Sequence, residues 1–170
     1  MVGFEMFRFE FNKRDIRKIV KACDKLKEVV HKSAETIPRQ WAFDFTRRFR
    51  SAIMSSKYQS QHPKLKAKYL KYKIRHSPYG ELTWKFNGIL MSEVSFWKDG
   101  RSTVWCSGIR KGKKGSFGQY IGAYAYWLEF GRPKQEERPI MRPEFSEFIM
   151  NEAHKPMVAL QAKINSVWKN

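Results

Sequence analysis

Residues 15–37, DIRKIVKACDKLKEVVHKSAETI, decide the fold that we expect of this chain. Apolar residues recur in it at steps of three and four, and charged side chains fill most of the other positions. The apolar set is Ile16, Ile19, Val20, Cys23, Leu26, Val30, Ala34 and Ile37. This period is that of an amphipathic helix, so the stretch predicts a helix of about six turns that begins near Asp15.

The apolar pattern continues beyond Pro38, which has no backbone N–H to offer to a helix. Its later members are Trp41, Phe45, Phe49, Ala52 and Ile53. Thr36 is a residue type that can cap a restarted helix. The sequence therefore predicts either two helices or one helix with a kink at the proline.

Strand patterns lie on both sides of this helical region. Residues 2–11 are rich in Phe with interspersed charges, which indicates an edge strand. Alternation over residues 81–86 and β-rich runs at 90–97 and 102–109 predict a small meander. The last two runs are joined by Lys98-Asp99-Gly100-Arg101, and Asp-Gly between such runs favours a hairpin.

Two segments concentrate the positive charge. Ten Lys or Arg and no acid lie between Phe45 and Gly80, so we expect a basic, partly extended arm or loop at about residues 56–80. Residues 110–118, RKGKKGSFG, predict a mobile basic hairpin loop. The candidate contacts to a partner or to DNA are Lys64, Lys66, Lys68, Lys71, Lys73, Arg75, Arg110, Lys111, Lys113 and Lys114. Three roles are compatible with this basic sequence: docking on an acidic protein, a solvated face, and direct contact with nucleic acid.

The C-terminal third contains an aromatic-rich segment followed by a predicted helix. Residues 120–130 form a short aromatic-rich segment that ends at Gly131. Apolar residues then recur at helical spacing over residues 145–167, and Pro156 predicts a bend there. Together the patterns predict a single α+β domain over residues 1–170, with a small antiparallel sheet packed against the long N-terminal helix and a C-terminal helix.

Composition limits the classes of partner. The chain has 170 residues, 15% aromatic residues and a net charge of +18, so it should fold. Nucleic acid, an acidic protein surface and an anionic membrane are the three candidate partners for that charge, and charge alone does not rank them. Charges interrupt every apolar run, so we expect no membrane-spanning helix, and the N-terminus does not resemble a signal peptide. Cys23 and Cys106 are too few for a disulfide framework, and we expect both to be reduced packing residues.

A search for catalytic chemistry finds no constellation. The glycines and lysines of residues 108–116 do not have the spacing of a phosphate-binding loop. No two of the four histidines are at the i, i+4 spacing of helical metal ligands, and the paired glutamates fall on predicted surfaces. We therefore expect no catalytic residue, no metal and no cofactor, and a protein that is not an enzyme.

Residues 120–148, YIGAYAYWLEFGRPKQEERPIMRPEFSEF, carry a resemblance to a known family. They resemble the signature of the tail-completion, or head–tail joining, proteins of tailed bacteriophages. In that family an aromatic segment ends in a Glu-Phe-Gly turn. A second element, made of Arg-Pro, then a pair of apolar residues and then a further Pro, opens the last helix. The residues that match are Tyr126, Glu129, Phe130 and Gly131 in the first part and Arg138, Pro139, Ile140, Met141 and Pro143 in the second. The candidate interface is Tyr126, Glu129, Phe130, Gly131, Arg138, Pro139, Arg142 and Pro143. Arg132 departs from the pattern, because the family often has a small hydroxyl residue there.

The motif also has a physical interpretation of its own. Gly131 supplies a backbone conformation that other residues avoid, and Pro143 loses no hydrogen bond at a helix start. Glu129, in an apolar context, would need a cation such as Arg138 or Arg142. A buried turn that makes no partner contact is the alternative interpretation of the whole block.

The resemblance implies a function. It implies a virion protein, assembled in the host cytoplasm, that forms a ring of identical subunits, most simply six, in the neck or at the head-proximal end of the tail. The ring would join the head connector to the tail tube or terminator around the DNA channel. The alternative hypothesis is a basic nucleic-acid-binding protein that acts as a monomer or dimer.

Overall fold

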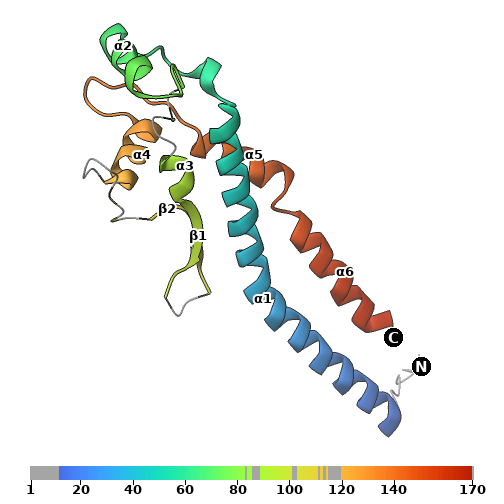
Figure 1. Ribbon diagram of the computed structural model, residues 1–170. Helices are drawn as coiled ribbons and strands as arrows, with labels where there is room; N and C mark the ends of the chain where they lie inside the picture. The colour runs from blue at the N-terminus through green and yellow to red at the C-terminus, as the bar shows by residue number, and fades with distance from the viewer. Residues whose placement is uncertain are drawn as a thin grey trace, which may run out of the picture.

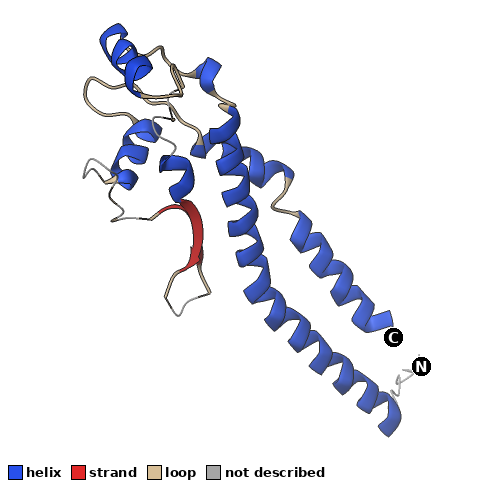
Figure 2. Cartoon of the chain, viewed as in Figure 1, coloured by secondary structure: helices blue, strands red, loops and turns tan. Residues whose placement is uncertain are grey.

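A computed structural model describes residues 12–82, 84–85, 89–100, 103–110, 112, 114 and 120–169. The elements follow in the order α1 (Lys13–Ser55), η1 (Gln59–Gln61), α2 (Ala67–His76), α3 (Ile89–Glu93), β1 (Val94–Lys98), β2 (Trp105–Ile109), α4 (Ile121–Phe130), α5 (Met141–Asn151) and α6 (Lys155–Lys169). The predicted α+β class is confirmed: a two-stranded antiparallel sheet packs against a long N-terminal helix that also carries the C-terminal helices (Figures 1 and 2). The predicted strand at residues 2–11 lies outside the described residues.

Helix α1 is a single helix of 43 residues that contains Pro38. Its axis changes direction partway along (Figure 1), so the kinked form of the prediction is the correct one. Asn12 is the N-cap, and its side chain accepts a hydrogen bond from the Asp15 backbone N–H at 2.9 Å. The helix therefore begins two residues before the predicted start.

The core lies on the second half of α1. Phe45, Phe49 and Ile53 from this helix pack against Trp84, Val94, Leu128, Ile140 and Phe148. Two polar links hold the sheet on the same helix: Thr46 Oγ1 lies 2.6 Å from Ser107 Oγ, and Arg50 Nε donates to the Val94 carbonyl at 2.8 Å. In contrast, Ser33 is the one buried residue of α1 before position 42.

The hairpin is confirmed, but the extent of the meander is not. β1 and β2 pair in register from Val94 with Ile109 to Lys98 with Trp105. The connection is longer than a two-residue turn: the Asp99 N–H donates to the Val104 carbonyl, and Gly100 has a φ of +56°. Of the strand predicted over residues 90–97, only the part from Val94 onward is a strand. Residues 89–93 form α3, because their Leu, Met and Glu favour a helix.

The predicted strand over residues 81–86 is also wrong where the structure describes it. The Lys85 N–H donates to the Leu82 carbonyl, which makes a turn. Trp84 is buried, and its indole N–H donates to the Arg138 carbonyl at 2.6 Å. Trp84 is therefore apolar because it is buried in the core, and its presence does not indicate a strand.

The C-terminal region contains two helices, where a single bent helix was predicted. α5 ends at Asn151, and the Glu152 and Ala153 N–H groups donate to the Phe148 carbonyl. Pro156 then lies in the first turn of α6, where its missing N–H costs nothing. The break therefore precedes the proline.

An ionic cluster holds α5 on α1. The buried Glu144 carboxylate accepts from Arg48 Nε at 2.7 Å, Lys57 Nζ at 3.0 Å and the Tyr58 hydroxyl at 3.0 Å. Glu147 accepts from Lys57 Nζ at 2.5 Å, and its hydrogen bonds with Lys57 and Tyr58 lower the pKa of its carboxyl. Desolvation, together with the two carboxylates, raises the pKa of Tyr58 to about 12.

Candidate interaction surfaces

The family-like residues meet at one junction, where α4 ends and α5 begins. The Glu129 carboxylate is 2% exposed and accepts from the backbone N–H groups of Ile140 at 2.9 Å, Met141 at 3.0 Å and Arg142 at 2.7 Å. The first turn of a helix leaves such N–H groups without helical partners, and a carboxylate there is favourable to the helix dipole. Glu129 is therefore the side chain that caps α5.

Glu129 was predicted to need a cation, either Arg138 or Arg142, and the structure shows that the cation is Arg142. Arg142 Nε lies 3.3 Å from the Glu129 carboxylate, and Nη2 donates to the Glu129 carbonyl and to Glu137, each at 2.7 Å. The hydrogen bond that Arg142 donates to Glu137, more than any other contact, raises the pKa of Arg142. Pro143 lies in the first turn of α5, as predicted.

Gly131 ends α4 with a φ of +71°. A Cβ on this residue would lie 3.0 Å from the Gln135 carbonyl oxygen and 3.2 Å from the Glu137 nitrogen. Both the backbone conformation and the space therefore require glycine, as the sequence indicated. The following loop closes on itself, because Arg132 and Gln135 exchange backbone hydrogen bonds.

Arg138 joins this junction to the basic arm. Its guanidinium donates to the carbonyls of Pro63 at 3.3 Å and Glu136 at 3.1 Å, and its backbone N–H donates to the Leu128 carbonyl at 2.6 Å. Beside it, His62 Nε2 lies 3.0 Å from the Pro139 carbonyl, which can only accept. Burial lowers the pKa of His62. Sequence reasoning missed this link, because residues about 75 apart carry no local signal of contact.

The predicted arm is therefore partly helical and docked. Residues 67–76 form α2, and the exposed basic side chains on and before it are Lys64, Lys66, Lys68, Lys71 and Arg75. Tyr69 and Tyr72 are exposed between them. The prediction of an exposed contact is wrong for Lys73, which is 1% exposed and donates to the Leu82 carbonyl. Desolvation lowers the pKa of Lys73 to about 8.

An open basic groove lies between this arm and the loop after α4. Its volume is about 1010 Å³. It is lined by Lys64, Leu65, Lys66, Tyr69, Tyr124, Leu128, Arg132, Pro133, Lys134, Gln135, Glu136 and Arg138. Five of these twelve side chains are cationic and one is acidic, so the groove suits an anionic ligand.

Most of the predicted loop at residues 110–118 lies outside the described residues, including Lys111 and Lys113. The two described contact candidates, Arg110 and Lys114, are exposed. Their cationic groups lie over the rings of Trp97 at 5.1 Å and Tyr120 at 5.4 Å. Each is thus held beside an aromatic ring, a geometry that cation–π attraction favours.

Two aromatic side chains of the motif point outward. Tyr126 is 60% exposed and Phe130 is 47% exposed, and their ring centroids are 4.8 Å apart. The Arg142 guanidinium lies 5.0 Å from the centre of the Phe130 ring. The junction thus combines an exposed aromatic pair with a buried, hydrogen-bonded turn beneath it. The sequence analysis had offered an interface or a buried turn as alternatives, and the structure contains an exposed surface and a buried turn together.

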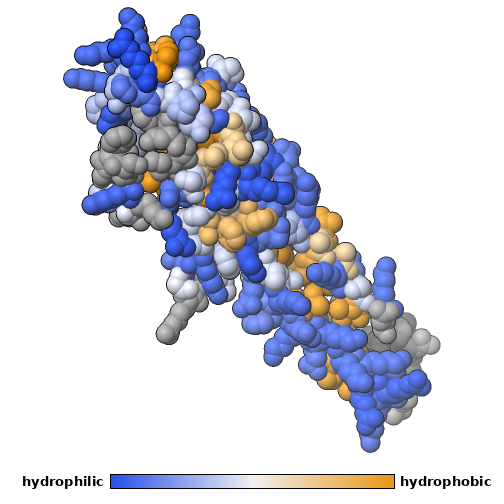
Figure 3. Space-filling view, viewed as in Figure 1, coloured by the Kyte–Doolittle hydropathy of each residue, from blue (hydrophilic) through white to orange (hydrophobic). Residues whose placement is uncertain are grey.

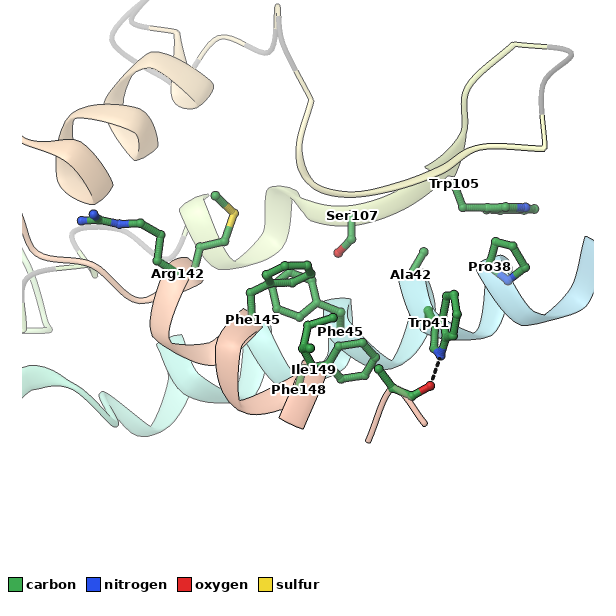
Figure 4. Close-up of a pocket in the computed structure, with 12 residues that line it drawn as sticks. Pro38, Trp41, Ala42, Phe45, Trp105, Ser107, Arg142, Phe145, Phe148 and Ile149 are labelled. Atoms are coloured by element: carbon green, nitrogen blue, oxygen red, sulfur yellow. Dashed lines mark hydrogen bonds between the residues drawn. The ribbon is translucent and has the colours of Figure 1, made fainter. Parts of the chain in front are cut away.

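An apolar groove of about 480 Å³ lies between α1, α5 and β2. Figure 4 shows Phe45, Phe145, Phe148 and Ile149 gathered on one side of it, with Trp41, Pro38 and Trp105 at the other end. The Trp41 indole N–H donates to the Ala153 carbonyl at 2.9 Å, which fixes the start of α6 beside Trp41. Phe145 and Ile149 remain half exposed.

The described part of the chain shows no group of three or more His, Cys, Asp or Glu side chains placed to hold a metal ion. None of its helices is long and apolar enough to cross a bilayer. Cys23 and Cys106 are free thiols, and Cys23 is exposed, so the predicted packing role is wrong for Cys23 within one chain.

Taken together, these features define an α+β chain with a capped, rigid α4–α5 junction and several exposed surfaces of basic and aromatic character. Comparison with protein-family models, with curated proteins and with solved structures finds no match to this chain.

Proposed function

We propose that the protein is a structural subunit of a tailed phage, which forms a ring in the neck or at the head-proximal end of the tail. The ring, most simply of six copies, completes the tail and joins it to the head connector around the DNA channel. The subunit acts by shape and charge complementarity, without turnover and without a cofactor.

The observation that carries the proposal is the α4–α5 junction. Glu129, which matches the head–tail joining signature, bonds across the junction to Arg142 of the candidate interface. Gly131 and Arg138 fix the loop between them, and Tyr126 and Phe130 remain exposed on its outside. Exposed aromatic side chains on a rigid base are the kind of residue that dominates protein interfaces.

The first experiment locates the protein in the particle. Virions are purified, probed with an antibody to this chain and imaged at the neck. The expected result is a ring of this protein at the head–tail junction. Absence from purified virions would exclude the proposal, and a location elsewhere in the tail would exclude the neck station.

A second experiment tests the aromatic pair. Tyr126→Ala combined with Phe130→Asp should lower the yield of joined particles in complementation at least tenfold, because both rings lie at the proposed contact. Met54→Asp is the matched control, since Met54 is 60% exposed and lies on α1, outside the motif. Equal yields from the two variants would remove the pair from the interface.

The second candidate function is nucleic-acid binding by a monomer or dimer. It is favoured by the exposed lysines and tyrosines of α2 and by the basic groove beside them. It predicts DNA binding with a steep salt dependence, weakened about tenfold or more by Lys68→Glu with Lys71→Glu. Binding by the isolated chain that these substitutions leave unchanged would exclude this surface.

A further inference from the structure

The first half of α1 presents an apolar stripe that α6 does not cover. The stripe consists of Ile16, Ile19, Val20, Cys23 and Val30. Its four aliphatic members are 46% to 53% exposed, and Cys23 is exposed as well. Figure 3 shows apolar side chains along the arm that α1 and α6 form, among the polar ones that surround them.

The length of α6 and the side of α1 on which it packs explain why the stripe is open. α6 starts beside Trp41, has 15 residues and is therefore about 22 Å long. It reaches back along α1 to about residue 26, whereas α1 begins at Lys13. Figure 1 shows α1 continuing beyond the end of α6. The side that faces α6 is the neighbouring one, on which Ala22, Leu26 and Val29 are half-buried and Ser33 is buried.

The spacing of the apolar residues specifies a helical partner. Within the stripe, Ile16, Ile19, Cys23 and Val30 follow one another at steps of three, four and seven, which is heptad spacing. That repeat keeps one seam facing a second helix over several turns, as in a coiled coil. Single exposed apolar residues are ordinary, but a continuous seam of them marks a contact surface.

The charges beside the stripe select the partner and its direction. On the flank away from α6, the exposed Lys13 and Arg17 lie near the start of α1, and the exposed Asp24, Glu28 and Glu35 lie further along. A second copy in the antiparallel direction brings the basic end of each helix against the acidic part of the other. A parallel two-fold copy would instead set this flank of one helix against the α6 side of the other, away from the complementary charges.

We infer that the protein pairs with a second copy of itself through this stripe, with the two α1 helices antiparallel and Cys23 at the centre. In this register Ile16 faces Val30 of the other copy, and Arg17 lies beside its Glu28. The stem of Lys27, a charged residue that lies between Cys23 and Val30 on this face, extends along the apolar surface to solvent. The contact is two-fold symmetric, so it can close a dimer without further copies.

This inference is independent of the proposed function, because it concerns the isolated full-length chain. The chain should sediment as a concentration-dependent dimer at physiological salt. Val20→Asp should raise the dissociation constant at least thirtyfold, while Met54→Asp on the second half of α1 leaves it unchanged. Helix content by circular dichroism should be equal in both variants, which separates lost pairing from lost folding.

Two further variants test the direction. Arg17→Glu should raise the dissociation constant about tenfold, and adding Glu28→Arg should restore it. In a Cys106→Ser background, diamide should cross-link two copies through Cys23. With Cys23→Ser and Ile16→Cys it should not, because two residues at position 16 would lie about 21 Å apart along the antiparallel pair.

Three outcomes overturn the inference. The chain is monomeric at all concentrations, or its oligomers are insensitive to Val20→Asp, or Ile16→Cys cross-links as readily as Cys23, which indicates a parallel pair. A monomer that binds vesicles of anionic lipid through Val20 would assign the stripe to a membrane surface and would overturn it equally.

Discussion

The α4–α5 junction and the first half of α1 are opposites in how they use their residues. At the junction, Glu129 and Arg138 are buried and every described hydrogen-bonding group of their side chains has a partner within the chain. On the first half of α1, Ile16 and Val20 are about half exposed and contribute little to the described core. The difference teaches that the chain completes its own structure in one region and leaves a surface for another molecule in the other.

The largest effect is expected from Glu129→Ala. The change leaves three N–H groups at the start of α5, one buried and two partly buried, without an acceptor and removes one partner of Arg142, so it should lower the free energy of unfolding by about 3 to 5 kcal/mol. Urea unfolding followed by tryptophan fluorescence measures it. Glu137→Ala, at an exposed partner of the same arginine, should cost less than about 1 kcal/mol. Equal losses would mean that the cap does not hold the junction.

A smaller loss is expected from Gly131→Ala. The new Cβ would meet the Gln135 carbonyl at 3.0 Å in a backbone conformation that alanine disfavours, which should cost about 1 to 3 kcal/mol. Gly122→Ala, inside α4 with its nearest neighbour at 3.7 Å, is the matched control and should be neutral or stabilising. If both variants unfold at the same urea concentration, the turn is not strained as described.

The link between the arm and the junction should depend on pH. Burial lowers the pKa of His62 in the folded chain, so its contribution to stability is present above the unfolded pKa of about 6.5 and is lost as the pH falls through the folded value. Unfolding free energies of the native chain and of His62→Gln should therefore diverge between pH 8 and pH 5. A constant difference across that range would contradict the burial of the ring.

The smallest effect is expected on the stripe itself. Val20→Ala should change the unfolding free energy of the monomer by less than about 0.5 kcal/mol, because its side chain is 53% exposed. The measurement is urea unfolding at the lowest concentration that fluorescence allows. A loss above about 1 kcal/mol in the monomer would show that the stripe is part of the chain's own core, and the contrast between the two regions would disappear.

Local patterns predicted those elements whose cause is local. The helical period found α1 through Pro38, and Asp-Gly found the hairpin between β1 and β2. The turn at Gly131 and the helix start at Pro143 were predicted correctly, because each depends on the conformational limits of a single residue type. The strand at 81–86 was wrong, since Trp84 is buried by contacts with residues distant in the sequence, among them the Phe49 ring and the Arg138 carbonyl.

The candidate site was predictable in its residues but not in its connections. Glu129 was expected to need a cation, and the letters could not choose between Arg138 and Arg142. The structure of the start of α5 decides between the two arginines. The turn that brings the α5 N–H groups to the Glu129 carboxylate also brings the Arg142 side chain to it. Lys73 was taken for a surface contact because lysines usually are, and only its burial and its hydrogen bond to the Leu82 carbonyl show otherwise.

By itself the sequence determined the α+β class, the long amphipathic helix, the hairpin and the excess of positive charge, since each follows from short-range periodicity or from composition. Only the tertiary structure decided which half of α1 is covered and which basic residues face solvent. The physical reason is that burial depends on where other elements end: α6 is too short to reach Ile16, and Arg138 lies where it can hold Pro63.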